Sequence, residues 1–276
     1  MIGRRRSGGG GRLIIAALLA VFAIGSYIFG ARSLNPVTGE NQRVDLTREQ
    51  EIALGLEAAP EMAREYGGLH SDQEAQAAVD QVGNQIVRQS SAANTNYEYA
   101  FHLLADEQTI NAFALPGGQI FITAGLYNQL QTEGELAGVL GHEIGHVVAR
   151  HSAEQIAKSR LVEGLTGAAV IAAYDPENPN SVSSAQMAAL IGQMVNMKFG
   201  REDELESDRL GVRFLAETGY DPRAMIRVME VLAQASQGPR QPEFFSTHPN
   251  PENRIGEIEA AIQEEFPDGV PEGVIK

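Results

Sequence analysis

The chain has 276 residues, with 21 Lys plus Arg against 36 Asp plus Glu, a formal net charge of −15, and no Cys. Without thiols it can form no disulfide, cysteine nucleophile or thiolate metal site, so any metal must be bound by His, Asp or Glu. The acidic balance argues against non-specific nucleic-acid binding, which needs clustered Lys and Arg.

The first thirty residues differ in character from the rest. Four arginines in residues 1–12 precede an uncharged stretch at 13–30, which as a helix would span roughly 27 Å and could cross a bilayer. The positive-inside rule then keeps the basic leader, 1–12, in the cytoplasm and exports the rest. We expect a single-pass inner-membrane protein whose body faces the periplasm or cell exterior, with a cleaved signal peptide as the alternative.

Three further segments follow the predicted transmembrane signal anchor. The polar stretch with Asn35-Pro36 and Thr38-Gly39 predicts a linker over 31–47. A folded domain is expected over 48–268, with a C-terminal tail at 269–276. The domain begins with two predicted helices, the second marked by Val79, Val82 and Ile86 at helical spacing.

A change of period then predicts a small β-sheet. Apolar and other residues alternate from Tyr97 to Leu104, as in a strand. Two further strands are expected near 110–114 and 119–123, joined by a tight turn at Leu115-Pro116-Gly117-Gly118.

Most of the chain from Thr132 onward has helical spacing. Thr132 and Glu135 form a capping-box pattern before a Gly-containing apolar stripe that ends near Val148. The later helices are expected at 154–173, 184–218, 222–236 and 251–265. The glycines of the first helix indicate close packing against another backbone, and the whole pattern predicts a mainly α-helical α+β fold.

The sharpest chemical pattern lies in that helix, at His142-Glu143-Ile144-Gly145-His146. Histidines at i and i+4 share a helix face, so both rings can reach one zinc ion while Glu143 acts as general base. The alternative is a pair of exposed histidines beside a solvated glutamate.

A catalytic zinc site needs a third protein ligand. One peptidase clan has another His ten residues after the first, but this chain has Ser152 there, and His151 is about 180° around the helix from His142. We therefore expect His151 at the surface or a helix end. Glu204 and Asp208 share a face of a later helix, so Glu204 can bind metal while Asp208 accepts a hydrogen bond from a ligating imidazole. A solvated acidic run, with Glu202, Asp203 and Glu206, is the alternative.

The motifs together resemble family forty-eight of the metallopeptidases, which contains HtpX-type and CAAX prenyl proteases. The resemblance covers roughly residues 50–265 and rests on five motifs in order: HEIGH at 142–146, REDELESDRLG at 201–211, NAFALPGG at 111–118, TAGL at 123–126, and STHP at 246–249 with Arg254. The predicted single span is most similar to the exported bacterial BepA-like members, although no helical-repeat domain follows in this chain.

The resemblance implies a zincin-like (gluzincin) domain that holds one Zn²⁺ per chain through His142, His146 and Glu204. Glu143 would take a proton from the attacking water and pass it to the leaving amine. His248 is a further candidate: it could bind zinc, contact the oxyanion or substrate, or only shape its loop. Arg254 is expected to tie that loop to the acidic helix.

Substrate is expected to lie extended past the zinc. The strand at 119–123 could offer its edge for β-addition, which makes Gly118, Gln119, Ile120 and Phe121 candidate substrate-binding residues; ordinary sheet structure is the alternative. Residues 161–173 and the loop at 175–183 form a candidate lid.

Two functions fit these patterns. The first is a membrane-anchored zinc metalloendopeptidase that hydrolyses misfolded or misassembled envelope proteins. The alternative is a zinc-containing, chaperone-like binding protein that cleaves little because His248 occupies the open position.

Overall fold

The computed structural model describes residues 32–44, 46–159, 198–238, 242–249 and 253–276, together with Ala17, Leu18, Val21, Ile24 and Gly25. The predicted leader, the predicted lid and most of the predicted anchor lie outside the described residues. None of the helices within these ranges combines the length and apolar character of a membrane span.

The predicted domain begins with the two expected helices. Helix α2 (Arg48–Glu65) begins after Thr47, whose side chain accepts from the backbone of Gln50 while the Gln50 side chain accepts from the Thr47 backbone. Helix α3 (Gln73–Gln89) begins after Asp72, and its Val79, Val82 and Ile86 are buried. A short helix η1 (Ser91–Thr95) follows.

A three-stranded sheet lies beside these helices, with strand order β3-β5-β4. Strand β5 (Gln119–Thr123) pairs in parallel with β3 (Ala100–Leu104) and antiparallel with β4 (Ala112–Ala114). The predicted tight turn joins β4 to β5, and Gly117 and Gly118 adopt the positive φ values that favour glycine. Both sides of β5 are therefore occupied within the sheet.

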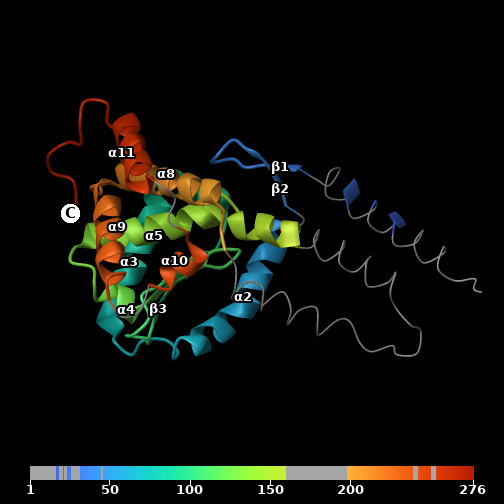
Figure 1. Cartoon of the computed structure of the whole chain (residues 1–276), viewed down its shortest axis with the longest axis horizontal. Helices are drawn as coiled ribbons and strands as arrows, with labels where there is room; N and C mark the ends of the chain where they lie inside the picture. Colours follow the sequence, from blue (N-terminus) through green and yellow to red (C-terminus); the bar gives the residue numbers. More distant parts are fainter. Residues whose placement is uncertain are drawn as a thin grey trace, which may run out of the picture.

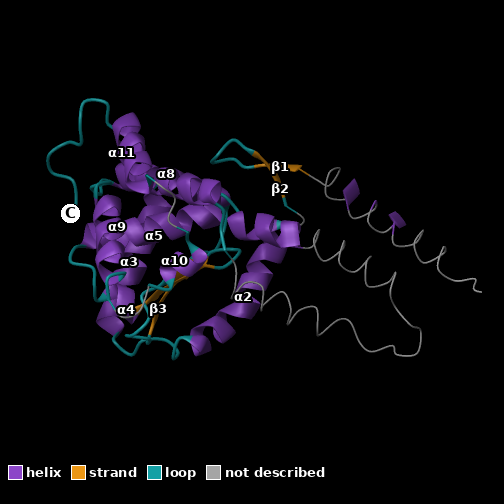
Figure 2. Cartoon of the chain, in the orientation of Figure 1, coloured by secondary structure: helices purple, strands orange, loops and turns teal. Residues whose placement is uncertain are grey.

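Helix α5 (Glu133–Val148) runs through the interior of the described fold, after the short helix α4 (Ala124–Tyr127). It packs against α3, α8 (Arg201–Thr218) and α9 (Ala224–Ala235), and α11 (Arg254–Glu265) packs on α8. Helices dominate the arrangement, with the three-stranded sheet on one side of α5 and the β1-β2 hairpin apart from that sheet (Figures 1 and 2). The described part is a mainly helical α+β domain, as predicted.

Close backbone contact explains the glycines of α5. A Cβ atom at Gly145 would lie 2.8 Å from the backbone oxygen of Ser207 on α8. The Ser207 hydroxyl also donates to the backbone oxygen of His142. The absence of a side chain at Gly145 thus lets the two helices approach closely, which confirms the predicted packing role of this glycine.

Two predicted helix boundaries differ from the structure. The helix expected over 184–218 begins only at Arg201, because residues 198–200 are non-helical and Gly200 is the N-cap. The helix expected to begin at residue 154 begins at residue 151. It is described as far as residue 159, and the rest of the predicted helix lies outside the described residues.

The segments predicted as linker and tail are both packed against the domain. Strands β1 (Arg32–Leu34) and β2 (Asn41–Arg43) form an antiparallel hairpin. The Asn35 side chain donates to the backbone oxygen of Val148 at 2.6 Å, and Gln42 donates to that of Ala149. These bonds satisfy carbonyls that the end of α5 leaves free. At the C-terminus Ile275 pairs with Tyr220. The linker prediction is therefore wrong for these residues, because local polarity did not reveal long-range hydrogen bonding.

Candidate metal centre

Four buried side chains from three parts of the chain converge at one point. His142 and His146 come from α5, Glu204 from the first turn of α8, and His248 from the residue after α10 (Phe244–Thr247). Their candidate ligand atoms all lie within 4.8 Å of one another. The Nε2 atoms of His142 and His146 are 3.1 Å apart, and Nδ1 of His248 is 3.0 Å from Oε1 of Glu204. This set of three imidazoles and one carboxylate matches the donors that zinc prefers when thiols are absent.

Unsatisfied buried atoms around the cluster fit a bound cation. Among the described residues, Nε2 of His248 and both side-chain oxygens of Glu143 are buried without a hydrogen-bond partner, and Oε2 of Glu204 has an ion-pair contact with Nη1 of Arg254 but no hydrogen bond. Buried polar atoms are normally paired, and an ion or an ordered water at the site is a usual explanation for exceptions. The residues present therefore fit a zinc ion.

The protonation states of Glu204 and His146 also suit a metal. Burial opposes ionisation of Glu204, but the charge of His248 and a hydrogen bond from His146 outweigh it and hold the pKa of Glu204 well below its ordinary value. Burial lowers the pKa of His146 well below that of a free imidazole. A metal ligand must be deprotonated, so both groups are already in the required form at neutral pH.

Glu143 is placed beside the cluster without being part of it. Its Oε1 atom lies 3.6 Å from Nε2 of His248, and its side chain is fully buried. Burial raises the pKa of Glu143, against the opposing charges of His248 and His142. A carboxylate with a raised pKa is a better proton acceptor, as a general base requires.

The Nδ1 side of the His142 ring contacts a buried ion pair. Nδ1 of His142 is 2.9 Å from Oδ1 of Asp208, and Arg254 donates from Nε to Oδ2 of Asp208 at 2.7 Å. Nη1 of Arg254 also lies 3.1 Å from Glu204. Burial disfavours the charge of Asp208, but Arg254 and His142 outweigh it and lower the pKa of Asp208. Asp208 therefore contacts a ligating ring, as the ExxxD spacing predicted, and Arg254 ties its segment to α8 as expected.

His151 does not lie where the helical period put it. It was expected at the surface or a helix end; it follows the end of α5 but is buried, with Nδ1 2.8 Å from Nδ1 of His146. Its Nε2 atom lies 3.2 Å from Oε2 of Glu206. The surface prediction is wrong because the helix does not continue through residues 149 and 150.

The turn that redirects the chain is centred on Arg150. This residue has a φ of 58°, a left-handed conformation that costs a non-glycine residue about 1–2 kcal/mol. Its guanidinium group is buried. Nε donates to the carboxylate of Glu51 at 2.9 Å, and Nη2 donates to the backbone oxygen of Leu46 at 2.9 Å. Residues of the N-terminal part thus hold this turn, a role that sequence reasoning missed because no local pattern links residue 51 to residue 150.

Comparison with known proteins agrees with the metal-binding geometry of the site. Residues 73–262 match the family described as "Peptidase family M48". The chain belongs to peptidase family M48. It is 29% identical over 259 residues, or 88% of its length, to the beta-barrel assembly-enhancing protease of Escherichia coli (strain K12), and 32% identical over 254 residues, or 91% of its length, to the mitochondrial metalloendopeptidase OMA1 of Schizosaccharomyces pombe.

The match covers different shares of these relatives. It spans 72% of the Schizosaccharomyces pombe protein but only 43% to 51% of the bacterial relatives of the same type as the Escherichia coli protein. The chain is thus similar to the bacterial proteins over about half of their length.

In this M48 chain the predicted substrate strand is not an edge. Strand β5 is paired on both sides, and Gln119, Ile120 and Phe121 are buried, so the prediction that β5 adds a substrate strand is wrong and ordinary sheet structure describes it. Gly118 also packs against the backbone of Tyr99 and Glu98. Residue alternation identified the strand but not its neighbours.

A cleft on the other side of β4 does reach the metal centre. It is lined by side chains of α2, of β4 and its turn, and of the segments near the site, among them Tyr66, Asn111, Phe113, Phe199 and His248. His248 is the one candidate ligand in this lining. The cleft therefore places apolar and hydrogen-bonding surface beside the metal-binding side chains.

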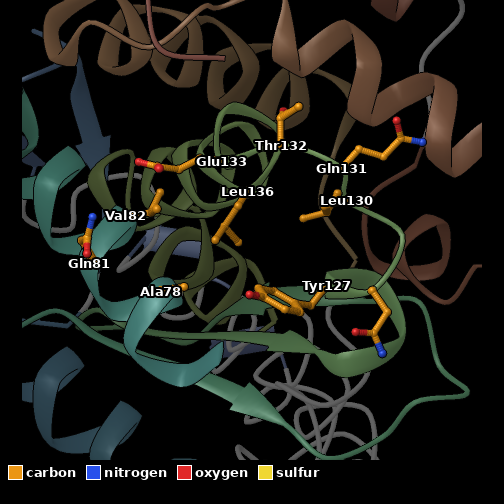
Figure 3. A pocket seen from close by; sticks show the side chains of 10 residues that line it. Ala78, Gln81, Val82, Tyr127, Leu130, Gln131, Thr132, Glu133 and Leu136 are labelled. Carbon is orange, nitrogen blue, oxygen red and sulfur yellow. The ribbon is translucent and has the colours of Figure 1, made fainter. Parts of the chain in front are cut away.

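A second cavity, of about 550 Å³, is not lined by a set of metal ligands. It lies between α3 and the segment joining α4 to α5, and Tyr127, Leu130 and Leu136 are among the side chains that line it (Figure 3). Its lining contains one carboxylate, that of Glu133, and no histidine. It is separate from the metal centre.

Proposed function

We propose that the chain is a zinc metalloendopeptidase with one Zn²⁺ bound by His142, His146 and Glu204, and with His248 as a further ligand. The observation that carries the proposal is the buried cluster of these four groups beside Glu143, whose two oxygens have no hydrogen-bond partner among the described residues. A binding site alone would not need a buried carboxylate without hydrogen bonds next to the ligands.

The roles of the residues follow from their positions. A zinc ion would supply Lewis acidity toward the scissile carbonyl and lower the pKa of the attacking water. Glu143 accepts the proton of that water and passes it to the leaving amine. Asp208, held by Arg254, fixes the ring of His142.

We further propose that substrate enters through the cleft beside β4 as an extended segment. Strand β4 pairs with β5 and with no other strand among the described residues, so in this sheet its second edge is a candidate for backbone pairing, although its three residues are buried without substrate. The name of the bacterial relatives, beta-barrel assembly-enhancing protease, supports misfolded or misassembled envelope proteins as substrates. The uncharged stretch at 13–30 supports attachment to the inner membrane with the domain in the periplasm or outside the cell.

The test compares wild type with Glu143→Gln on an unfolded protein substrate, with the zinc content of each measured. Loss of the general base should lower kcat by about 100- to 10,000-fold while zinc is retained. Glu133→Gln is a matched control: it lies on the same helix, keeps an acceptor for the hydroxyl of Tyr220 and should leave kcat unchanged. A wild-type protein that holds one zinc and cleaves nothing, even after His248→Ala, would contradict the peptidase proposal.

His248 favours one alternative, a zinc-containing, chaperone-like protein with little proteolysis. Its Nδ1 atom lies within 3.3 Å of both Glu204 and His142, so a fourth protein ligand can fill the position that substrate or water needs. In that case His248→Ala should increase cleavage from almost none. Cleavage by wild type at a rate typical of a protease, and equal to that of His248→Ala, would exclude this alternative.

A further inference from the structure

The two histidines of α5 differ in the group that contacts Nδ1 of each ring. Nδ1 of His142 faces the carboxylate of Asp208, whereas Nδ1 of His146 faces another imidazole, that of His151. Both contacts are buried and shorter than 3.0 Å. The same helix therefore carries one carboxylate-backed and one imidazole-backed ligand.

The contact between His146 and His151 restricts where the protons can be. Nε2 of His146 is the atom that faces the cluster, 3.1 Å from Nε2 of His142 and 3.4 Å from Glu204. A neutral imidazole that offers Nε2 to a metal carries its hydrogen on Nδ1. That hydrogen must be donated to His151, whose Nδ1 is then the acceptor.

The second ring nitrogen of His151 completes the chain of hydrogen bonds. If Nδ1 of His151 accepts, its hydrogen is on Nε2, and this atom lies 3.2 Å from Oε2 of Glu206 on α8. A carboxylate can only accept in its ionised form, so the direction of this bond agrees with the first. The hydrogen bonds run in one sense from His146 through His151 to Glu206.

Two further contacts hold this arrangement. Phe199 stacks on the ring of His146 with a centroid distance of 4.1 Å and an interplanar angle of 21°. The left-handed turn at Arg150, bonded to Glu51, brings His151 back toward α5. The ring of His146 is thus covered on one face and hydrogen-bonded at its edge.

We propose that His151 is a positioning residue that fixes the tautomer and orientation of His146, with Glu206 as the terminal acceptor. The inference rests on the proposed zinc site but concerns residues that bind no metal themselves. Groups that hydrogen-bond the outer nitrogen of a ligating histidine typically change metal affinity by about 10- to 100-fold. Here an imidazole stands between the ligand and the carboxylate, whereas Asp208 contacts His142 directly.

The test measures zinc affinity by competition with a chromophoric chelator, using wild type and four variants. His151→Phe keeps a ring but loses the acceptor, and should weaken zinc binding about 10- to 100-fold. His151→Gln, which can still accept from His146, should recover part of that affinity. Glu206→Gln should cause a smaller loss than His151→Phe. His102→Phe, the same change on β3 with stacking on Phe121 available to the new ring, should have no effect on affinity.

A second measurement does not depend on any variant folding. Nitrogen-15 NMR of the zinc-loaded wild-type protein should show the Nδ1–H tautomer for His146 and the Nε2–H tautomer for His151. A doubly protonated His151, or a hydrogen on its Nδ1, would overturn the proposal. So would a folded His151→Phe with wild-type zinc affinity.

The outcomes separate this inference from the proposed function. A wild-type protein that binds no zinc contradicts both. A wild-type protein that binds zinc with the other tautomer of His151 contradicts only the role of His151. Neither readout depends on peptidase activity.

Discussion

Helix α5 is buried at every residue except Glu133, whereas α8 has a charged first turn and buries only part of its length. Both supply metal-binding side chains. On α5 the ligands are positioned by close backbone packing, as at Gly145, and the surrounding residues are apolar. On α8 the ligand Glu204, like Asp208 behind His142, is positioned by charge, because both are buried carboxylates that face the buried cation of Arg254. One site thus depends on two different kinds of interaction, and they can be broken separately.

The largest expected effect is on the charged side. In Arg254→Met the carboxylates of Glu204 and Asp208 stay buried without their cation, so the metal-free protein should lose about 3–5 kcal/mol of unfolding free energy, measured by urea denaturation. Arg64→Met is the control, because both side chains of its ion pair with Glu61 are more than half exposed, and it should cost less than about 1 kcal/mol. Equal losses in the two variants would show that charge does not hold α8 in place.

The next effect tests backbone packing. In Gly145→Ala the new Cβ would lie 2.8 Å from the backbone oxygen of Ser207, so α5 and α8 must separate. We expect a loss of about 3 kcal/mol and weaker zinc binding, measured by urea denaturation and chelator competition. In Gly141→Ala the nearest atom is the end of the Leu215 side chain, which can move, and the loss should be about 1 kcal/mol or less. A similar result for both glycines would argue against close helix approach.

A smaller effect is expected at the end of α5. Asn35→Ala removes the donor to the backbone oxygen of Val148 and should cost about 1–2 kcal/mol, because a buried carbonyl is left unpaired. Thr38→Ala is the control in the same hairpin. The Thr38 hydroxyl accepts only an exposed hydrogen bond from the backbone of Glu40, so its loss should change stability by less than about 0.5 kcal/mol. If thermal denaturation shows no difference between the two, the hairpin does not stabilise α5.

The smallest effect is local to the start of α5. The hydroxyl of Thr132 accepts from the backbone of Glu135, so Thr132→Ala should cost about 1 kcal/mol. Thr132→Ser keeps the hydroxyl and should retain most of that stability. Urea denaturation of the two variants measures the difference.

Prediction from the sequence succeeded where one element contains the whole signal. The capping pattern at Thr132 and the alternation before Leu104 are short-range patterns, and the helix and strand they predict are present. It was less accurate where a boundary depends on packing. The start of α8 at Arg201 is an example, because the apolar spacing before it continues without a stop signal.

The site residues also divide into those that a local pattern identifies and those that only packing identifies. The spacing of His142 and His146 by itself places both rings on one side of a helix. The acidic run at 202–208 did not by itself distinguish a ligand from solvated charges, and only the packing of α8 on α5 selects Glu204 and Asp208 and leaves Glu206 half-buried. For His248 the sequence left three roles open, and the structure places its ring within reach of the ligands.

The sequence alone therefore determined the i, i+4 histidines with their glutamate, the mainly helical α+β class and a metal site without thiolates, because residue type and helical period are local properties. Tertiary structure decided that β5 is central in its sheet, that residues 32–44 pack on the domain, and that His151 is buried against His146. The physical reason is the same in each case. Hydrogen bonds between distant segments, and a left-handed turn held by an ion pair to Glu51, depend on groups that no local window of sequence contains.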